Sequence, residues 1–132
     1  MTTRKMTTAK DADLFRFHKE QLLIEVESTA DWRARKAEEY PDDPRNDRSA
    51  KALAKLARRL SRIKSDHPTI RALAEFWERE DTQAEQIKAD LTDEQSRYIG
   101  RYGFDYPEDG DPVGFLQDLQ DLVAAVRSEE AA

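Results

Sequence analysis

The most distinctive chemistry in this sequence belongs to six basic side chains between residues 44 and 64. At about 100° per residue they share one face of a helix, opposite a leucine-rich stripe. No aspartate or glutamate lies between Asp47 and Asp66. Like charges one helical turn apart repel by about 0.2–0.5 kcal/mol per pair, so an anionic group is expected to lie against this face. We call the six residues the basic face: Arg48, Lys51, Lys55, Arg58, Arg59 and Arg62.

Three kinds of surroundings could accommodate this basic face: the acidic half of the chain, solvent and a binding partner. Residues 51–71 carry seven basic and one acidic residue, whereas residues 72–132 carry five and sixteen. The acidic second half of the chain is therefore one candidate, and simple solvation is the ordinary fate of a charged surface. A binding partner is the other possibility. Because few aromatic residues lie on this face to stack on bases, a protein partner is favoured over a nucleic acid.

A second pattern, Arg62 to His67, could support catalysis. Arg62-Ile63-Lys64-Ser65-Asp66-His67 resembles the Arg-x-x-x-x-His motif of HEPN-type ribonucleases, which are also small and all-α. The resemblance covers six residues and implies that Arg62 stabilises the scissile phosphate while His67 acts in acid–base catalysis. The second motif position, usually polar in that family, is Ile63 here, and Pro68 interrupts the helix. The alternative is that His67 caps a helix or is exposed.

No other pattern predicts a catalytic, metal or cofactor site. In the acidic segment 105–111, a calcium loop starting at Asp105 would need an oxygen ligand at Pro107 and a glutamate at Leu116, so a turn followed by a helix N-cap is expected. His18 and His67 lie far apart, and there is no cysteine to bind zinc. There is also no glycine-rich phosphate loop.

The elements that must position these residues are helices. Apolar residues recur at helical spacing in at least four segments, which predicts an all-α fold: a compact bundle or stacked hairpins of five to six helices. The first helix runs from about Thr8, with or without a break near Ser28-Thr29. Further helices are expected to begin near Pro44, His67 or Pro68, Thr92 and Pro112. The helix that begins near His67 or Pro68 is expected to carry an apolar side through Ile87.

Composition limits the whole chain to one modest domain. Its 132 residues have a net charge of −6, and 38% of them are charged. We predict a single helical domain over 1–132, with residues 1–7 and 128–132 as disordered tails. The N-terminus is polar, and the longest apolar run spans only five residues, Leu122 to Val126. These features predict a cytoplasmic protein that does not cross a membrane.

Three functions follow from these patterns. The favoured hypothesis is a non-enzymatic helical protein-interaction module, such as an adaptor, an inhibitor or a regulator, which binds a protein through the basic face together with exposed aromatic residues. The alternatives are a HEPN-like ribonuclease using Arg62 and His67, and a nucleic-acid-binding regulator using the basic face of the 44–64 helix. The sequence leaves the partner's identity and the oligomeric state open.

Overall fold

A computed structural model describes residues 9–78 and 82–131 of the chain. It confirms the all-α prediction: the described residues form α-helices and connecting loops, with no strand among them. The helices are α1 (Ala9–Glu39), α2 (Pro44–Leu60), α3 (Pro68–Trp77), α4 (Thr82–Arg101) and α5 (Pro112–Ala131). None of these helices, as far as their residues are described, is long and apolar enough to cross a membrane.

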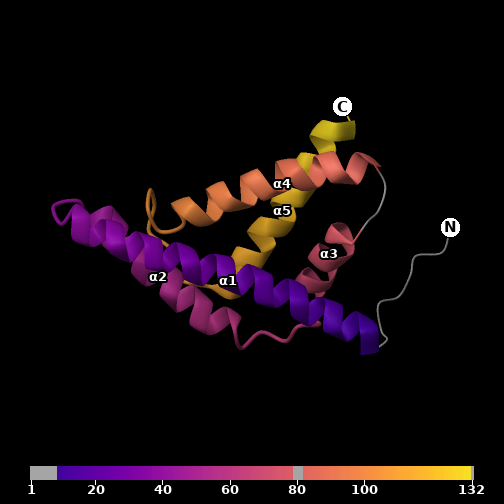
Figure 1. The fold of residues 1–132 in the computed structure, drawn as a ribbon, viewed down its shortest axis with the longest axis horizontal. Helices are drawn as coiled ribbons and strands as arrows, with labels where there is room; N and C mark the ends of the chain where they lie inside the picture. The colour runs from indigo at the N-terminus through magenta and orange to yellow at the C-terminus, as the bar shows by residue number, and fades with distance from the viewer. Residues whose placement is uncertain (1–8, 79–81, 132) are drawn as a thin grey trace.

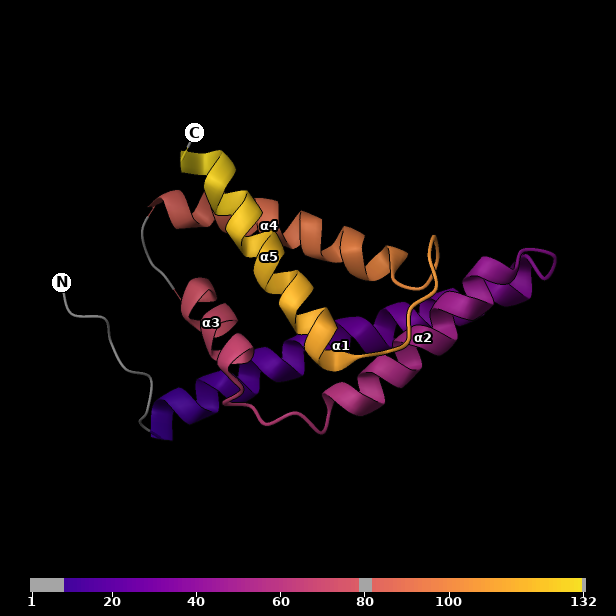
Figure 2. The same ribbon diagram turned by 180° about the vertical axis from the view of Figure 1, so that it is seen from behind.

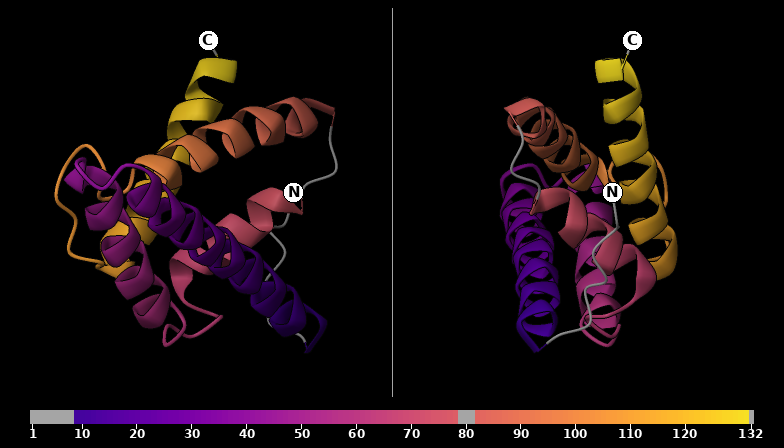
Figure 3. Two further views of the ribbon diagram at one scale, coloured as in Figure 1. Left: turned by 60° about the vertical axis from the view of Figure 1, so that its left-hand side comes forward. Right: turned by 90° about the vertical axis from the view of Figure 1, so that its right-hand side faces the viewer.

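The long helix α1 and the helix α2 form an antiparallel hairpin, which lies along one side of the molecule (Figure 1). Seen from behind, α5 begins beside the hairpin, runs away from it and packs against α4, which it crosses at an angle (Figure 2). The short helix α3 lies between α1 and α5, as the two further views show (Figure 3). The bundle is therefore a hairpin covered by the other three helices, and α2 stays at its edge.

Every helix contributes apolar side chains to one main core. The α2 stripe predicted from the sequence is fully buried at Leu53, Leu56 and Leu60. It belongs to one cluster with buried residues of all the other helices, because each helix has one apolar stripe that must be removed from water. Representative members from the other helices are Val26, Ile70, Leu91, Ile99 and Leu116.

Three of the predicted helix starts are confirmed, and each is explained by a cap. Asp43 accepts a hydrogen bond from the Arg45 N–H, and Pro44 fills the first helical position, where its missing N–H costs nothing. His67 and Pro68 begin α3 in the same way. Asp111 begins α5, with its side chain accepting from the Val113 N–H at 3.1 Å.

The predicted start at Thr92 is wrong. Residue 92 lies inside α4, and its hydroxyl donates to the Lys88 carbonyl at 2.8 Å. Gln95, expected to complete a capping box, instead donates to the Glu25 side chain of α1 at 3.1 Å. A threonine followed by glutamine three residues later is equally compatible with a helix interior when both side chains find other partners.

The helix expected from Pro68 through Ile87 is also wrong, because α3 ends at Trp77 and α4 begins at Thr82. Trp77 and Ala84 are seven residues apart, so the apolar stripe keeps its phase across the break and periodicity does not reveal it. Along α1, by contrast, the helix continues through Ser28-Thr29 without interruption. The backbone of residues 128–131 continues α5 where a tail was expected, and the tail predicted for residues 1–7 lies outside the described residues.

Candidate functional site

The basic face lies on the side of α2 that points away from the core. The α4–α5 loop, which connects Arg101 to Pro112, runs along one edge of this face. Arg48, Lys55 and Arg59 lie on the edge under the loop, whereas Lys51, Arg58 and Arg62 lie on the other edge. The five members within α2 share one face, as the sequence predicts, but the helix ends at Leu60 instead of continuing to residue 64, so Arg62 lies in the turn that follows. The fold also divides the basic face into a covered edge and an exposed edge.

The covered edge binds backbone carbonyls of the loop. Arg48 donates to the carbonyls of Gly103 at 3.0 Å and Phe104 at 2.5 Å. Arg59 donates to the Asp109 carbonyl at 3.2 Å. Ser49, buried beside them, donates its hydroxyl to the Tyr102 carbonyl at 2.5 Å. Part of the basic face is therefore satisfied by the acidic half of the chain, through peptide carbonyls rather than through ion pairs.

Two glycines allow the loop to lie this close to α2. Gly103 and Gly110 have positive φ angles of 68° and 75°, which residues with a Cβ rarely adopt. A Cβ at Gly103 would lie 2.8 Å from the Ala52 Cβ, and one at Gly110 would lie 3.0 Å from the Lys55 Cγ. The loop therefore contacts α2 at both of its ends, and Lys55 is half-buried beneath it.

The exposed edge has little intramolecular compensation. Lys51 forms an ion pair with Asp47, one turn earlier, at 2.8 Å. Arg58 and Arg62 are exposed, and within residues 9–78 and 82–131 neither side chain has an ion pair or hydrogen bond. Arg58 does line a shallow depression of about 400 Å³, whose opposite wall on α1 includes Glu27 and Asp31. These two arginines are thus the part of the basic face most accessible to an anionic partner.

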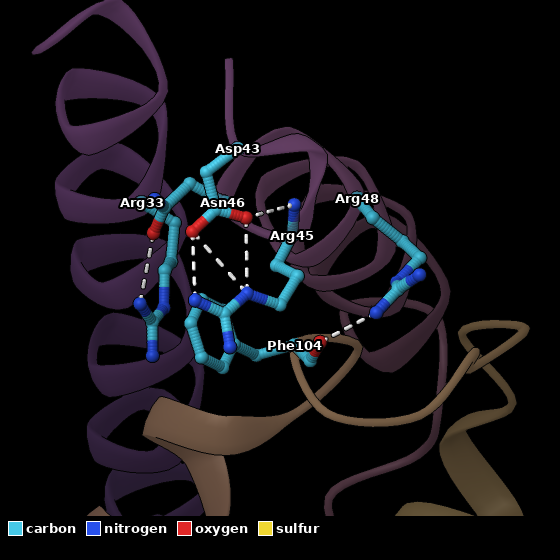
Figure 4. Close-up of polar contacts among 6 residues, drawn as sticks. All are labelled: Arg33, Asp43, Arg45, Asn46, Arg48 and Phe104. Atoms are coloured by element: carbon cyan, nitrogen blue, oxygen red, sulfur yellow. Dashed lines mark hydrogen bonds and ion pairs between the residues drawn. The ribbon is translucent and has the colours of Figure 1, made fainter. Parts of the chain in front are cut away.

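A second arginine cluster, which the sequence analysis missed, joins α1, α2 and the end of α4 (Figure 4). Arg33 is buried, and its Nη1 donates to the Asn46 Oδ1 at 2.9 Å. Its Nε donates to the Gly100 carbonyl at 3.1 Å, and its guanidinium carbon lies 4.0 Å from the centre of the Phe104 ring. Burial lowers the pKa of Arg33, while nearby Asp105 opposes that shift. The only sequence signal was an arginine on the apolar stripe of α1, seven residues after Val26.

Arg45 completes this cluster on the outside. Its guanidinium carbon lies 4.6 Å from the centre of the Phe104 ring. The same group forms a bidentate ion pair with Asp43, with Nε and Nη2 at 2.9 and 2.8 Å from the two carboxylate oxygens (Figure 4). The Arg45 hydrogen bonds hold the pKa of Asp43 at about 2. The polar groups of this cluster bind one another where α1, α2 and the end of α4 meet, so the cluster has a structural role.

The Arg62–His67 pattern falls in the connection between α2 and α3. Arg62 lies in the turn that follows α2, and His67 is the N-cap of α3, with its Nδ1 accepting from the Thr69 N–H at 3.2 Å. The histidine thus adopts the capping role that the sequence analysis gave as the alternative. The two residues lie on either side of a turn rather than along one helix.

The acidic segment 105–111 forms a turn and a cap. Asp109 accepts from the Asp111 N–H at 3.0 Å, and Asp111 in turn caps α5. Among the described residues, no group of three or more histidine, aspartate or glutamate side chains is arranged to hold a metal ion. No protein-family model matches this chain, and no curated protein or solved structure shows detectable similarity to it.

Proposed function

We propose that this protein is a non-enzymatic helical interaction module that binds an acidic protein surface through the exposed edge of the basic face. The observation that carries the proposal is the state of Arg58 and Arg62. Both are exposed and unpaired in the described part of a chain that has 28 acidic residues for 22 basic ones. Acidic side chains are abundant in this protein, yet none of those described pairs with Arg58 or Arg62. This favours an anionic partner on another molecule.

A protein is the preferred partner over a nucleic acid for two reasons. No aromatic residue occurs anywhere in α2, so the basic face offers no platform on which bases could stack. The net charge of −6 also disfavours the long-range attraction that brings nucleic acids to basic proteins. An acidic protein patch needs only a few complementary charges, and these mainly accelerate association and select the partner.

The test is a pull-down from an extract of the native host, followed by stopped-flow kinetics with the isolated partner. The variant Arg58→Gln/Arg62→Gln removes the two unpaired charges without touching the core or the covered edge. Arg16→Gln/Arg35→Gln removes two exposed charges from α1 and serves as the matched control. We expect the first variant to keep its melting temperature and to lose the partner mainly through a slower on-rate, while the control binds as the parent does.

The same samples distinguish the other functions. Co-purified nucleic acid whose affinity falls steeply with salt, and less steeply in the Arg58/Arg62 variant, would favour the nucleic-acid-binding regulator. RNA cleavage that disappears in His67→Ala would favour the HEPN-like ribonuclease. Equal partner binding by the parent and the Arg58/Arg62 variant would contradict the proposal.

A further inference from the structure

A separate pocket of about 260 Å³ lies where α4, the α4–α5 loop and α5 meet. Its walls include Tyr98 and Tyr102 of α4, Tyr106 and Glu108 of the loop, and Leu122 of α5. Pockets for drug-sized ligands usually span about 300–1,000 Å³, so this one suits a single side chain or a small amine. None of its residues belongs to the basic face.

The aromatic wall of this pocket is already in place. Tyr98 stacks on Phe115 with the ring centres 5.7 Å apart, and Tyr102 meets the same ring edge-on at 5.8 Å. The Tyr98 hydroxyl donates to Asp118 at 2.5 Å. Burial, with Asp118, raises the pKa of Tyr98, so the phenol stays protonated. A ligand would therefore meet a rigid wall and would not need to order it on binding.

The basic residues of the pocket are already neutralised. Arg97 forms an ion pair with Glu94 at 2.7 Å, and Arg101 forms one with Asp105 at 2.6 Å. Both pairs lie along α4 and at the start of the loop, and all four side chains line the pocket. The guanidinium groups are thus committed to neighbouring carboxylates, which leaves little positive charge to attract an anion.

Glu108, in contrast, is a carboxylate without a cation. In the described part of the chain it has no hydrogen bond or ion pair. Desolvation raises the pKa of Glu108, and the charges of Asp118 and Asp109 raise it further. The groups around Glu108 therefore disfavour its negative charge, and a cation in the pocket would offset this repulsion.

We propose that this pocket binds an alkylammonium group, namely the end of a lysine side chain that a partner protein presents. The ammonium would lie against the tyrosines, whose rings attract cations, and next to Glu108. The methylene stem would cover Leu122 and the apolar parts of the wall. A primary and a methylated lysine share this chemistry. The pocket adds a second recognition feature, of opposite charge to the basic face, and does not depend on the function proposed for that face.

The test is an NMR titration of the full chain with three small probes. These are the doubly blocked amino acids N-acetyl-lysine methylamide, its Nζ-trimethyl form and N-acetyl-norleucine methylamide. Probes of this size are expected to bind weakly, with a Kd of about 1 mM. Resonances of Tyr98, Tyr102 and Tyr106 should shift with one or both lysine probes and not with the neutral norleucine probe. The tighter of the two lysine forms identifies the natural ligand.

Two variants with matched controls test the residues. Glu108→Gln should weaken binding about fivefold, since an exposed ion pair contributes up to about that factor. Tyr106→Ala should weaken it about threefold through the lost aromatic contact. Both side chains are exposed, so the melting temperature should not change. Glu75→Gln and Tyr40→Ala remove an exposed glutamate and an exposed tyrosine elsewhere, and should bind as the parent does.

Three results would overturn the proposal. The first is equal binding of the norleucine and lysine probes, which would make the pocket merely apolar. The second is a stronger response of the same tyrosines to N-acetyl-glutamate methylamide, which would mean that Arg97 and Arg101 still attract anions. The third is an unchanged affinity for lysine in Glu108→Gln.

Discussion

At the scale of single residues, Arg33 of α1 joins that helix to α2 and to the end of α4. Its guanidinium is held by Asn46 of α2 and by the Gly100 carbonyl of α4, and it lies over the ring of Phe104. A buried guanidinium is tolerated only where its donors are satisfied, because desolvation of an unpaired charge costs several kcal/mol. Here hydrogen bonds and an aromatic face supply that compensation.

Removing this guanidinium should therefore destabilise the fold. Arg33→Met keeps an unbranched apolar stem but removes the guanidinium, which leaves the Asn46 side-chain carbonyl and the Gly100 carbonyl without their donor and should lower the free energy of unfolding by about 2–3 kcal/mol. Urea denaturation measures the change. Arg35→Met, an exposed arginine two residues along α1, should stay within about 0.5 kcal/mol of the parent. Equal effects of the two substitutions would contradict a structural role for Arg33.

Asp43 gives a pH-dependent prediction. Its carboxylate pairs with Arg45, and its pKa of about 2 lies below the ordinary value of 3.8. Because this pKa is lower in the folded state, the carboxylate adds to the free energy of unfolding when the pH is above its unfolded-state pKa. This contribution is lost as the pH falls through about 2. Asp43→Asn retains a good N-cap but not the charge, so its stability deficit relative to the parent should shrink between about pH 4 and pH 2. Denaturation curves across this range, with Asp42→Asn as the control, test this. A constant deficit would contradict it.

At the scale of elements, the α4–α5 loop is held by its fit to α2. Its two positive-φ glycines contact α2 near Ala52 and near Lys55. Between these contacts the loop carbonyls accept hydrogen bonds from side chains of α2. This arrangement places Asp111 to cap α5, so the contact with α2 also determines where the last helix begins.

A pair of glycine substitutions tests this fit. Gly110→Ala introduces a Cβ at positive φ, within 3.2 Å of the Leu56 N, and should lower the free energy of unfolding by about 1–3 kcal/mol. Gly100→Ala lies within α4, where a Cβ meets nothing within 4 Å, and should raise it by about 0.5–1 kcal/mol. Thermal and urea unfolding of both variants give the comparison. An unchanged or raised stability in Gly110→Ala would mean that the loop does not pack against α2 as described.

At the scale of the whole molecule, α2 connects the surface to the core, because one side of the helix carries the basic face and the other carries Leu53, Leu56 and Leu60. Leu60→Ala should lower the free energy of unfolding by about 2–5 kcal/mol, through lost burial and the cavity left behind. Val113→Ala, where the side chain is 53% exposed, should have an effect below about 0.5 kcal/mol. An unchanged melting temperature in Leu60→Ala would show that this side of α2 does not face the core.

The parts of this molecule that the sequence predicts are those governed by local rules. Helical periodicity identified the leucine stripe and the opposing basic residues, and proline after an aspartate or a histidine identified three helix starts. The division of the basic face was not predictable, because Arg48 and Phe104 are 56 residues apart and their contact depends on the path of the loop. Arg33 was missed because an arginine on an apolar stripe is usually at the edge of a core.

The way α2 holds the α4–α5 loop has a consequence for how this protein can change over evolution or be engineered. Arg48, Ser49 and Arg59 bind backbone carbonyls, which every amino acid possesses. The intervening positions Tyr106, Pro107 and Glu108 are exposed and take no part in those bonds. Their side chains are therefore free to vary while the backbone keeps its path, provided that Gly103 and Gly110 remain. The loop is thus a suitable place to install new binding specificities on an unaltered scaffold.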